Sequence, residues 1–251
     1  MKIFIANDDG IDSVGLKALA ERLARDNDVL VVAPDSNRSV CSHSLTIRKG
    51  ITLTEKIGRG YKAYSIDGFP VDCVKVLMHL FPEFKADVIV SGINKAHNVG
   101  ADTYYSGTVA VAYEGAYYGI PSFAFSAYSH GEDSPFDLYA DYAANIIENL
   151  LPISDSKVVW NVNFPNNDVS VRGVKFTKLS AQTYKDTYEL LPDKTYRLKS
   201  ESIPLSDIIQ NDGQSSDLAL VKQGYVTITP MKTDRTDYVK LAEAENLCIK
   251  L

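Results

Sequence analysis

The first 165 residues alternate between short apolar runs and longer segments with helical spacing. Apolar runs bounded by turn residues are typical of strands that are covered on both faces of a parallel sheet. They predict strands at residues 2–6, 29–33, 87–90, 122–126 and 158–162. Apolar positions three and four residues apart predict helices at 13–25, 71–81, 107–118 and 137–151. This alternation indicates an α/β protein, with a Rossmann-like, three-layer core around a parallel sheet.

The pattern changes after residue 165. Apolar and polar residues then alternate, most clearly at 225–230, and helical spacing is not expected again before about 237–247. Short strands are also expected within residues 45–66. We therefore predict two parts, an α/β core at 1–165 and a hairpin-rich extension at 166–251.

Composition narrows the class of protein. The 251 residues are 45% hydrophobic and carry a net charge of -6, which argues against nucleic-acid polymers and anionic membranes as partners. Three widely spaced cysteines, Cys41, Cys73 and Cys248, suit a reducing compartment better than a disulfide framework or a zinc site. The N-terminus shows no secretory signal, and no apolar run approaches the ~18 residues of a membrane span, so we expect a cytoplasmic protein.

Polar residues follow three of the predicted strands. Asp8 and Asp9 come directly after the first strand, where two adjacent carboxylates repel each other unless a cation or several donors lie nearby. The second strand leads into a polar loop at 36–44, and the third leads to Asn94 and Asn98. Because the carboxyl ends of parallel strands meet at one edge of a sheet, these groups should converge. A set of oxygen ligands favours a hard cation such as Mg²⁺, Mn²⁺ or Ca²⁺.

A hydroxyl-rich segment, Tyr105-Ser106-Gly107-Thr108, stands directly before a predicted helix. The free N–H groups at a helix N-terminus, together with the positive end of its dipole, bind anions. A metal next to such a helix start indicates hydrolysis of a phosphate ester. The metal polarises a phosphoryl oxygen and lowers the pKa of the attacking water.

Four motifs resemble, in order and spacing, the SurE family of survival-protein nucleotidases. They are Asn7-Asp8-Asp9-Gly10, Pro34-Asp35-Ser36-Asn37-Arg38-Ser39, Ser91-Gly92-Ile93-Asn94 and Tyr105-Ser106-Gly107-Thr108-Val109. Weaker matches at 68–73, 161–165 and 224–230 extend the resemblance over nearly the whole chain.

The resemblance implies a phosphatase that hydrolyses nucleoside 5′- and 3′-monophosphates, with a metal-bound water as nucleophile. One divalent cation, Mg²⁺ or Mn²⁺ (or Ca²⁺ in a crystal), would be held by Asp8, Asp9, Ser39 and Asn94. Asn37 and Asn98 would join Asp8 and Asp9 as catalytic residues, and phosphate would be bound by Ser106, Gly107 and Thr108. The resemblance also implies a homodimer or homotetramer in which C-terminal segments are exchanged between subunits.

Two positions depart from the family pattern. Ala96 stands where glycine is common, and Val40 stands where a small residue is usual. Both flank the predicted metal site, so the resemblance leaves the geometry of these loops and the substrate preference open, although the types of ligand are unchanged.

Other interpretations of the same residues stay open. A receiver-like signalling module also has an acidic pair after its first strand, but it needs a phosphoacceptor aspartate where this chain has Asn94. A nucleotide-binding protein without turnover would share all of the motifs. His43 and His97 lie in the predicted site loops and could act as general acid or base. We favour a structural role for His43 and leave His97 undecided.

Overall fold

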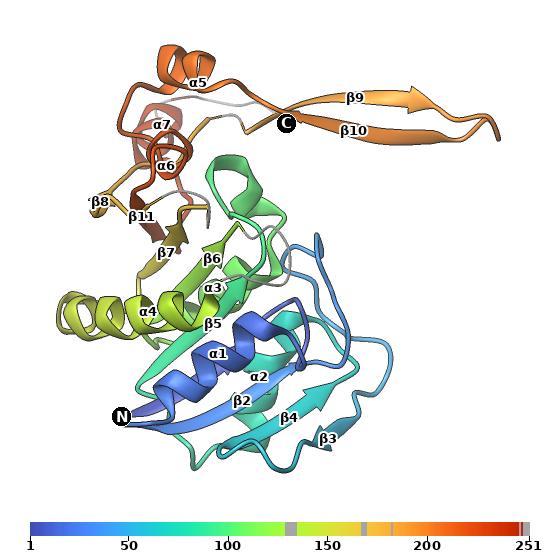
Figure 1. Ribbon diagram of the computed structural model, residues 1–251, viewed down its shortest axis with the longest axis vertical. Coiled ribbons are helices and arrows are strands. Elements are labelled where there is room, and N and C mark those ends of the chain that lie inside the picture. Colours follow the sequence, from blue (N-terminus) through green and yellow to red (C-terminus); the bar gives the residue numbers. More distant parts are fainter. Residues whose placement is uncertain (129–134, 167–169, 182, 246, 248–251) are drawn as a thin grey trace.

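A sheet of nine strands with helices on both faces forms the body of the protein (Figure 1). The computed structural model describes residues 1–128, 135–166, 170–181, 183–245 and 247. Cys248 and part of the helix predicted at 237–247 lie outside the described residues. The predicted α/β class and three-layer arrangement are confirmed.

The middle of the sheet contains six parallel strands. In spatial order they are β4 (Lys62–Ile66), β2 (Asp28–Pro34), β1 (Lys2–Ala6), β5 (Val88–Asn94), β6 (Ser122–Ala127) and β7 (Val158–Phe164). The strand order reverses between β1 and β5. The chain first adds β2 and β4 on one side of β1, and then adds β5, β6 and β7 on its other side. In open α/β sheets, ligands bind outside the carboxyl ends of the strands at such a reversal.

Helices α1 (Val14–Leu23) and α4 (Phe136–Leu150) cover one face of the sheet, and α2 (Pro70–Leu80) and α3 (Gly107–Tyr117) cover the other (Figure 1). Successive side chains of β1 point to opposite faces. Ile3 and Ile5 therefore pack in the cluster that includes α1 and α4, whereas Phe4 packs in the cluster that includes α2. The short 3₁₀ helices η1 (Gly100–Tyr104) and η2 (Leu151–Ile153) follow β5 and α4.

The strand predicted at 87–90 is longer in the structure. β5 continues through Ser91 to Asn94, with an irregular register against β6. The backbone approaches β6 so closely at Gly92 that a Cβ there would lie 2.3 Å from the Phe125 carbonyl oxygen. The polar and glycine residues end the apolar run in the sequence without ending the strand.

Two strands from beyond residue 165 extend the same sheet. β11 (Val226–Lys232) pairs antiparallel with β7, and β8 (Val174–Phe176) pairs with β11. At the opposite edge, β3 (Leu53–Glu55) pairs antiparallel with β4, within the region where short strands were predicted. The division at residue 165 stays a prediction, but both of its parts contribute to one sheet.

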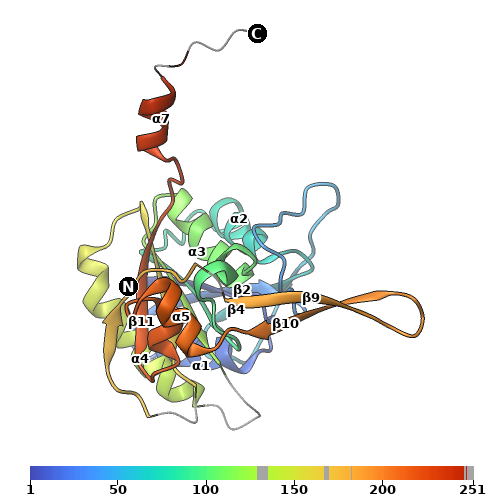
Figure 2. The ribbon, with the colours of Figure 1, turned by 90° about the horizontal axis from the view of Figure 1, so that it is seen from above.

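A two-stranded arm made of β9 (Tyr184–Leu190) and β10 (Tyr196–Ser202) projects from the body (Figures 1 and 2). Helix α7 (Tyr238–Ala244) extends from the body in a different direction (Figure 2). The expectation that no helix lies between residues 165 and 237 is wrong, because α5 (Leu205–Asp212) and α6 (Asp217–Val221) lie there. Both are short, and they pack on Val99 through a few apolar residues. Segments of this length show too little periodicity to be distinguished from loops.

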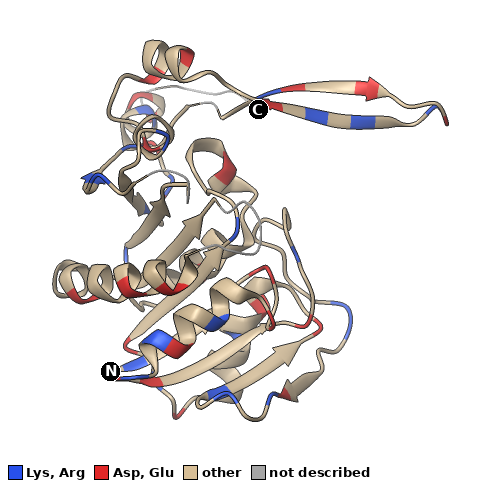
Figure 3. Cartoon of the chain, viewed as in Figure 1, with Lys and Arg blue, Asp and Glu red and all other residues tan. Residues whose placement is uncertain are grey.

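Charged residues of both signs are interspersed over the elements (Figure 3). Within the described residues, no helix combines the length and apolar character that a bilayer span requires.

Candidate metal and phosphate site

The turn after β1 positions the two acidic residues. Asn7 is buried, its Nδ2 donates to the Gly10 carbonyl (3.1 Å), and its Oδ1 accepts from the Gly10 N–H (3.2 Å). Gly10 has a φ of +101°, in the left-handed region that favours glycine. This Asn7–Gly10 turn presents Asp8 and Asp9 at the carboxyl edge of the sheet.

Asp8 is bonded to the first residues of α3. Its side chain is almost fully buried, since the residue is 3% exposed. The Gly107 N–H donates to Asp8 Oδ2 (3.1 Å), and the Thr108 hydroxyl donates to Asp8 Oδ1 (2.5 Å). The helix start that was predicted to bind an anion therefore binds a carboxylate of the chain itself.

This arrangement bears on the three residues predicted to bind phosphate. Gly107 and Thr108 direct donors to Asp8, while Ser106 caps α3 by accepting from the Val109 N–H (3.0 Å). The structure thus gives each residue a role in orienting Asp8 or α3. Their direct contact with phosphate stays a prediction.

Asp9 lies beside Asp8 and accepts from the Lys95 N–H (3.2 Å), which follows β5. Burial, and then the neighbouring charge of Asp8, raise the pKa of Asp9 to about 6. Burial also raises the pKa of Asp8, although the hydrogen bonds from Thr108 and Gly107 oppose that shift. Two adjacent carboxylates that are costly to ionise are stabilised by a cation, so this pair fits a metal.

The site loop, residues 36–44, is bonded to the end of β1. The Arg38 N–H donates to the Asp8 carbonyl (2.7 Å), and the Ser39 N–H donates to Asn37 Oδ1 (2.7 Å). Ser39 and Asn37 are both exposed. Asn37 therefore orders the backbone of Ser39, and a direct role for Asn37 in catalysis stays a prediction.

The two departures from the family pattern have different consequences. Val40 has a φ of 58°, and the left-handed region costs a residue with a Cβ about 1–2 kcal/mol. Ala96 is not among the non-glycine residues with positive φ in the described part of the chain. Its carbonyl accepts from Asn94 Nδ2 (2.7 Å), a contact that any residue could make. The strain lies at Val40 and not at Ala96.

Asn94 and Asn98 come together at the ends of β5 and β6. Asn94 pairs in register with Ser126 of β6, and Asn98 Nδ2 donates to Ser126 Oγ (2.8 Å). The Asn98 N–H donates to Asn163 Oδ1 (2.8 Å), and its carbonyl accepts from Asn161 Nδ2 (2.7 Å). These bonds fix Asn98 in a buried amide cluster.

Asn161 and Asn163 were not predicted as site residues. They are alternate residues of β7, so their side chains share one face of the sheet. Two amides separated by one apolar residue inside a buried strand are unusual, because buried polar groups need partners. That pattern could have placed them beside the site.

His97 has a structural role. Its Nε2 lies 2.7 Å from the Phe164 carbonyl oxygen, and burial lowers its pKa to about 4. At neutral pH the ring is therefore neutral and donates its N–H to that carbonyl. His43 instead contacts a carboxylate, with 2.8 Å between its Nε2 and Glu114 Oε2.

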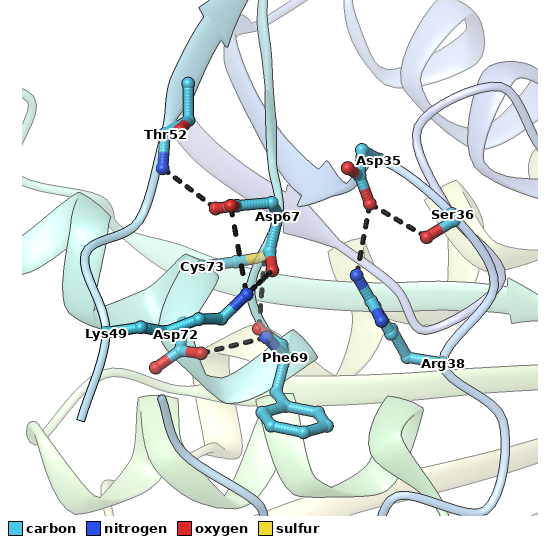
Figure 4. Close-up of polar contacts among 9 residues, drawn as sticks. All are labelled: Asp35, Ser36, Arg38, Lys49, Thr52, Asp67, Phe69, Asp72 and Cys73. Atoms are coloured by element: carbon cyan, nitrogen blue, oxygen red, sulfur yellow. Dashed lines mark hydrogen bonds and ion pairs between the residues drawn. The ribbon is translucent and has the colours of Figure 1, made fainter. Parts of the chain in front are cut away.

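Two carboxylates that directly follow β2 and β4 accept hydrogen bonds from nearby loop residues (Figure 4). Asp35 accepts from the Ser36 hydroxyl (2.8 Å) and from Arg38 (3.3 Å), and Asp67 accepts from the Thr52 N–H (2.8 Å). Within the described residues, no group of three or more His, Cys, Asp or Glu side chains could hold a metal. The candidate site therefore depends on two carboxylates together with hydroxyl and amide oxygens, a set suited to Mg²⁺ or Mn²⁺.

Comparisons with known proteins point to one family. A family model described as survival protein SurE matches residues 3–186. A relative named 5′-nucleotidase SurE from Clostridium botulinum (strain Alaska E43 / Type E3) is 38% identical and covers 98% of this chain and 99% of its own length. Another of that name, from Pseudothermotoga lettingae, is 36% identical, covering 98% of this chain and 95% of its own. The crystal structure of SurE protein from Aquifex aeolicus has a TM-score of 0.82 at 33% identity, over 97% of this chain and 98% of that one.

Proposed function

The chain belongs to the SurE family, and we propose that it is a divalent-metal-dependent 5′-nucleotidase that hydrolyses nucleoside monophosphates to nucleoside and phosphate. The observation that carries the proposal is the Asp8–Asp9 pair at the reversal of strand order, with Asp8 buried and bonded to the start of α3 and Asp9 partly buried. Relatives named 5′-nucleotidase SurE supply the substrate class. We propose that the enzyme also hydrolyses nucleoside 3′-monophosphates.

We propose that Asp8, Asp9, Ser39 and Asn94 hold the cation. When bound, a divalent cation polarises a phosphoryl oxygen and lowers the pKa of water. Thr108 and Gly107 fix both oxygens of Asp8, so the carboxylate is oriented before a cation arrives. Asn94 Nδ2 donates to the Ala96 carbonyl, which leaves its Oδ1 as the ligand atom.

Asn98 is proposed to hydrogen-bond the substrate phosphate as charge develops on it. Asn98 donates to Asn163 and Ser126 and accepts from Asn161, and these bonds hold its backbone and side chain, so little reorganisation is needed. Asn37 acts through the backbone of Ser39, and Ser106 supplies a hydroxyl beside the helix start.

A homodimer or homotetramer, located in the cytoplasm, is the proposed state of the enzyme. The β9–β10 arm supports an oligomer, because every residue of both strands is exposed. Tyr188, Leu190, Tyr196 and Leu198 form cross-strand pairs on one face of the arm. A two-stranded hairpin with an exposed apolar face is marginal in water unless it packs on a partner.

Phosphate release from AMP tests the function directly. The full chain is expected to release phosphate and adenosine from AMP with Mn²⁺ or Mg²⁺. This release is expected to stop after EDTA treatment. Release that persists in EDTA would contradict the metal requirement. AMP binding by equilibrium dialysis, without release under any metal condition, would instead support a nucleotide-binding protein. Labelling by acetyl phosphate would support a receiver-like module.

Metal affinity should depend on pH through Asp9. Because burial and Asp8 raise the pKa of Asp9 to about 6, protons compete with the cation below that pH. The dissociation constant for Mn²⁺ is expected to increase about tenfold per pH unit below 6, and to change little between pH 7 and 8. Calorimetric titration at pH 5, 6, 7 and 8 measures this, and an affinity that is constant from pH 7 to 5 contradicts it.

A further inference from the structure

A buried carboxylate on α3 connects the site loop to α2. The Glu114 side chain is only 7% exposed, and its two oxygens have different partners. Oε2 lies 2.8 Å from His43 Nε2, and Oε1 lies 2.5 Å from Lys75 Nζ. An ionised carboxylate that is buried without a partner destabilises the fold. The pairing with His43 and Lys75 is therefore favourable, and it restrains the positions of both side chains.

The side chain of Lys75 is held in position by two tyrosines. Its Nζ donates to the Tyr118 hydroxyl (3.1 Å) and lies 5.0 Å from the centre of the Tyr118 ring and 5.8 Å from that of Tyr117. These hydrogen-bond and cation–π contacts join α2 to the end of α3. Burial opposes the charge of Glu114, but hydrogen bonds from His43 and Lys75 outweigh it and lower the pKa of Glu114. His43 is therefore bound by an ionised group on a rigid element.

The same helix contacts the metal site at its other end. Gly107, the first residue of α3, donates to Asp8, and Glu114 is seven residues further along. Seven residues are about two helical turns, so both positions lie on one side of α3, about 10 Å apart along its axis. One helix thereby contacts both Asp8 and the loop that contains Ser39.

The site loop needs such support, because part of its backbone is unfavourable. Val40 and Ser42 both have positive φ, 58° and 53°. The Ser42 N–H and hydroxyl donate to the carbonyls of Tyr105 (2.9 Å) and Tyr104 (2.8 Å). His43, the next residue, adds a contact to a buried charge, which stabilises a loop conformation that the backbone alone disfavours.

We propose that Glu114, held by Lys75, is a positioning residue for the metal site. Through His43 it keeps the site loop where Ser39 can contribute to the cation bound by Asp8 and Asp9. Glu114 touches neither the cation nor the substrate in this proposal. The inference rests on the proposed function for its role in catalysis, but its effect on metal affinity is measured without substrate.

Glu114→Gln and His43→Ala test the proposal through a double-mutant cycle. Each single variant is expected to weaken Mn²⁺ binding by about tenfold or more, as loss of a supporting contact does around metal sites. The double variant should bind Mn²⁺ no more weakly than the weaker single variant, because both changes break one contact. Calorimetry without nucleotide measures the affinities, and thermal melting checks that each variant is folded.

Asp141→Asn is the matched control. It also neutralises a carboxylate that bonds a basic side chain on another helix, since Arg22 Nε lies 2.5 Å from Asp141 Oδ1. That pair joins α1 and α4, on the opposite face of the sheet from α3. Its Mn²⁺ affinity should equal that of the wild-type chain.

Several outcomes overturn the proposal. They are a wild-type Mn²⁺ affinity in folded Glu114→Gln or His43→Ala, additive losses in the double variant, and no Mn²⁺ binding by the wild-type chain. If Glu114→Gln does not fold, His43→Ala decides alone, because the His43 side chain is 44% exposed and its removal leaves Glu114 with Lys75. Mn²⁺ binding without phosphate release from AMP would contradict the proposed function while leaving the positioning role supported.

Discussion

Asp9→Asn is expected to lower phosphate release from AMP by about a hundredfold or more, with the fold retained. Asp9 supplies one of the two negative charges of the proposed metal site, and a divalent cation contributes several kcal/mol of transition-state stabilisation. The Asp9 side chain accepts a hydrogen bond from the Lys95 N–H (3.2 Å). An asparagine oxygen can accept that bond, so the substitution removes charge without removing a structural contact.

The measurements are kcat for AMP in saturating Mn²⁺, the dissociation constant for Mn²⁺, and the melting temperature. Asp12→Asn is the matched control, because this carboxylate is also near the end of β1 but is 71% exposed and bonds to Arg59. It should retain wild-type activity. Turnover and Mn²⁺ binding that survive in Asp9→Asn would contradict the assignment of the acidic pair as metal ligands.

Asp8→Asn is a less specific test. Both oxygens of Asp8 accept hydrogen bonds, from Gly107 and from Thr108, and an amide can supply only one oxygen. The new NH₂ group would face one of these donors, and a buried group left without a partner costs about 1–3 kcal/mol. Loss of activity in this variant therefore combines a metal effect with a structural one.

The sequence was sufficient to predict the core because the strands are covered on both faces. Runs such as Val29 to Ala33 stay apolar without alternation, and a helix such as α1 shows one apolar face. The convergence of Asp8 with Gly107, which are 99 residues apart, followed from the shared edge of parallel strands. Topology alone brings such residues together.

Side-chain partners across elements could not be predicted in this way. The contact between His43 and Glu114 spans 71 residues and depends on how α3 is rotated about its axis. The donors at the start of α3 were expected to face phosphate, but Asp8 reaches them first because the end of β1 packs against that turn. A pattern of residue types predicts that a helix start binds an anion, but not which anion it binds.

Gly107→Ala is expected to lower kcat/KM for AMP by about a hundredfold and the free energy of unfolding by about 1–3 kcal/mol. A Cβ at residue 107 would lie 2.8 Å from Asp8 Cβ, 2.9 Å from Cys41 Sγ and 2.9 Å from Pro70 Cγ. These atoms belong to the end of β1, the site loop and α2, so a methyl group would push apart the elements that form the site. The added group changes no charge and removes no donor, and the effect therefore measures how closely the elements must approach.

Gly50→Ala is the matched control for this substitution. A Cβ at residue 50 would meet no atom within 4 Å, and Gly50 is not among the described glycines with positive φ. The same chemical change there should leave activity and melting temperature close to wild type. The Gly107→Ala variant should also bind Mn²⁺ more weakly, because its methyl group displaces Asp8 from the N–H of residue 107. Wild-type Mn²⁺ affinity and turnover in Gly107→Ala would show that the contact between α3 and Asp8 is not needed to form the metal site.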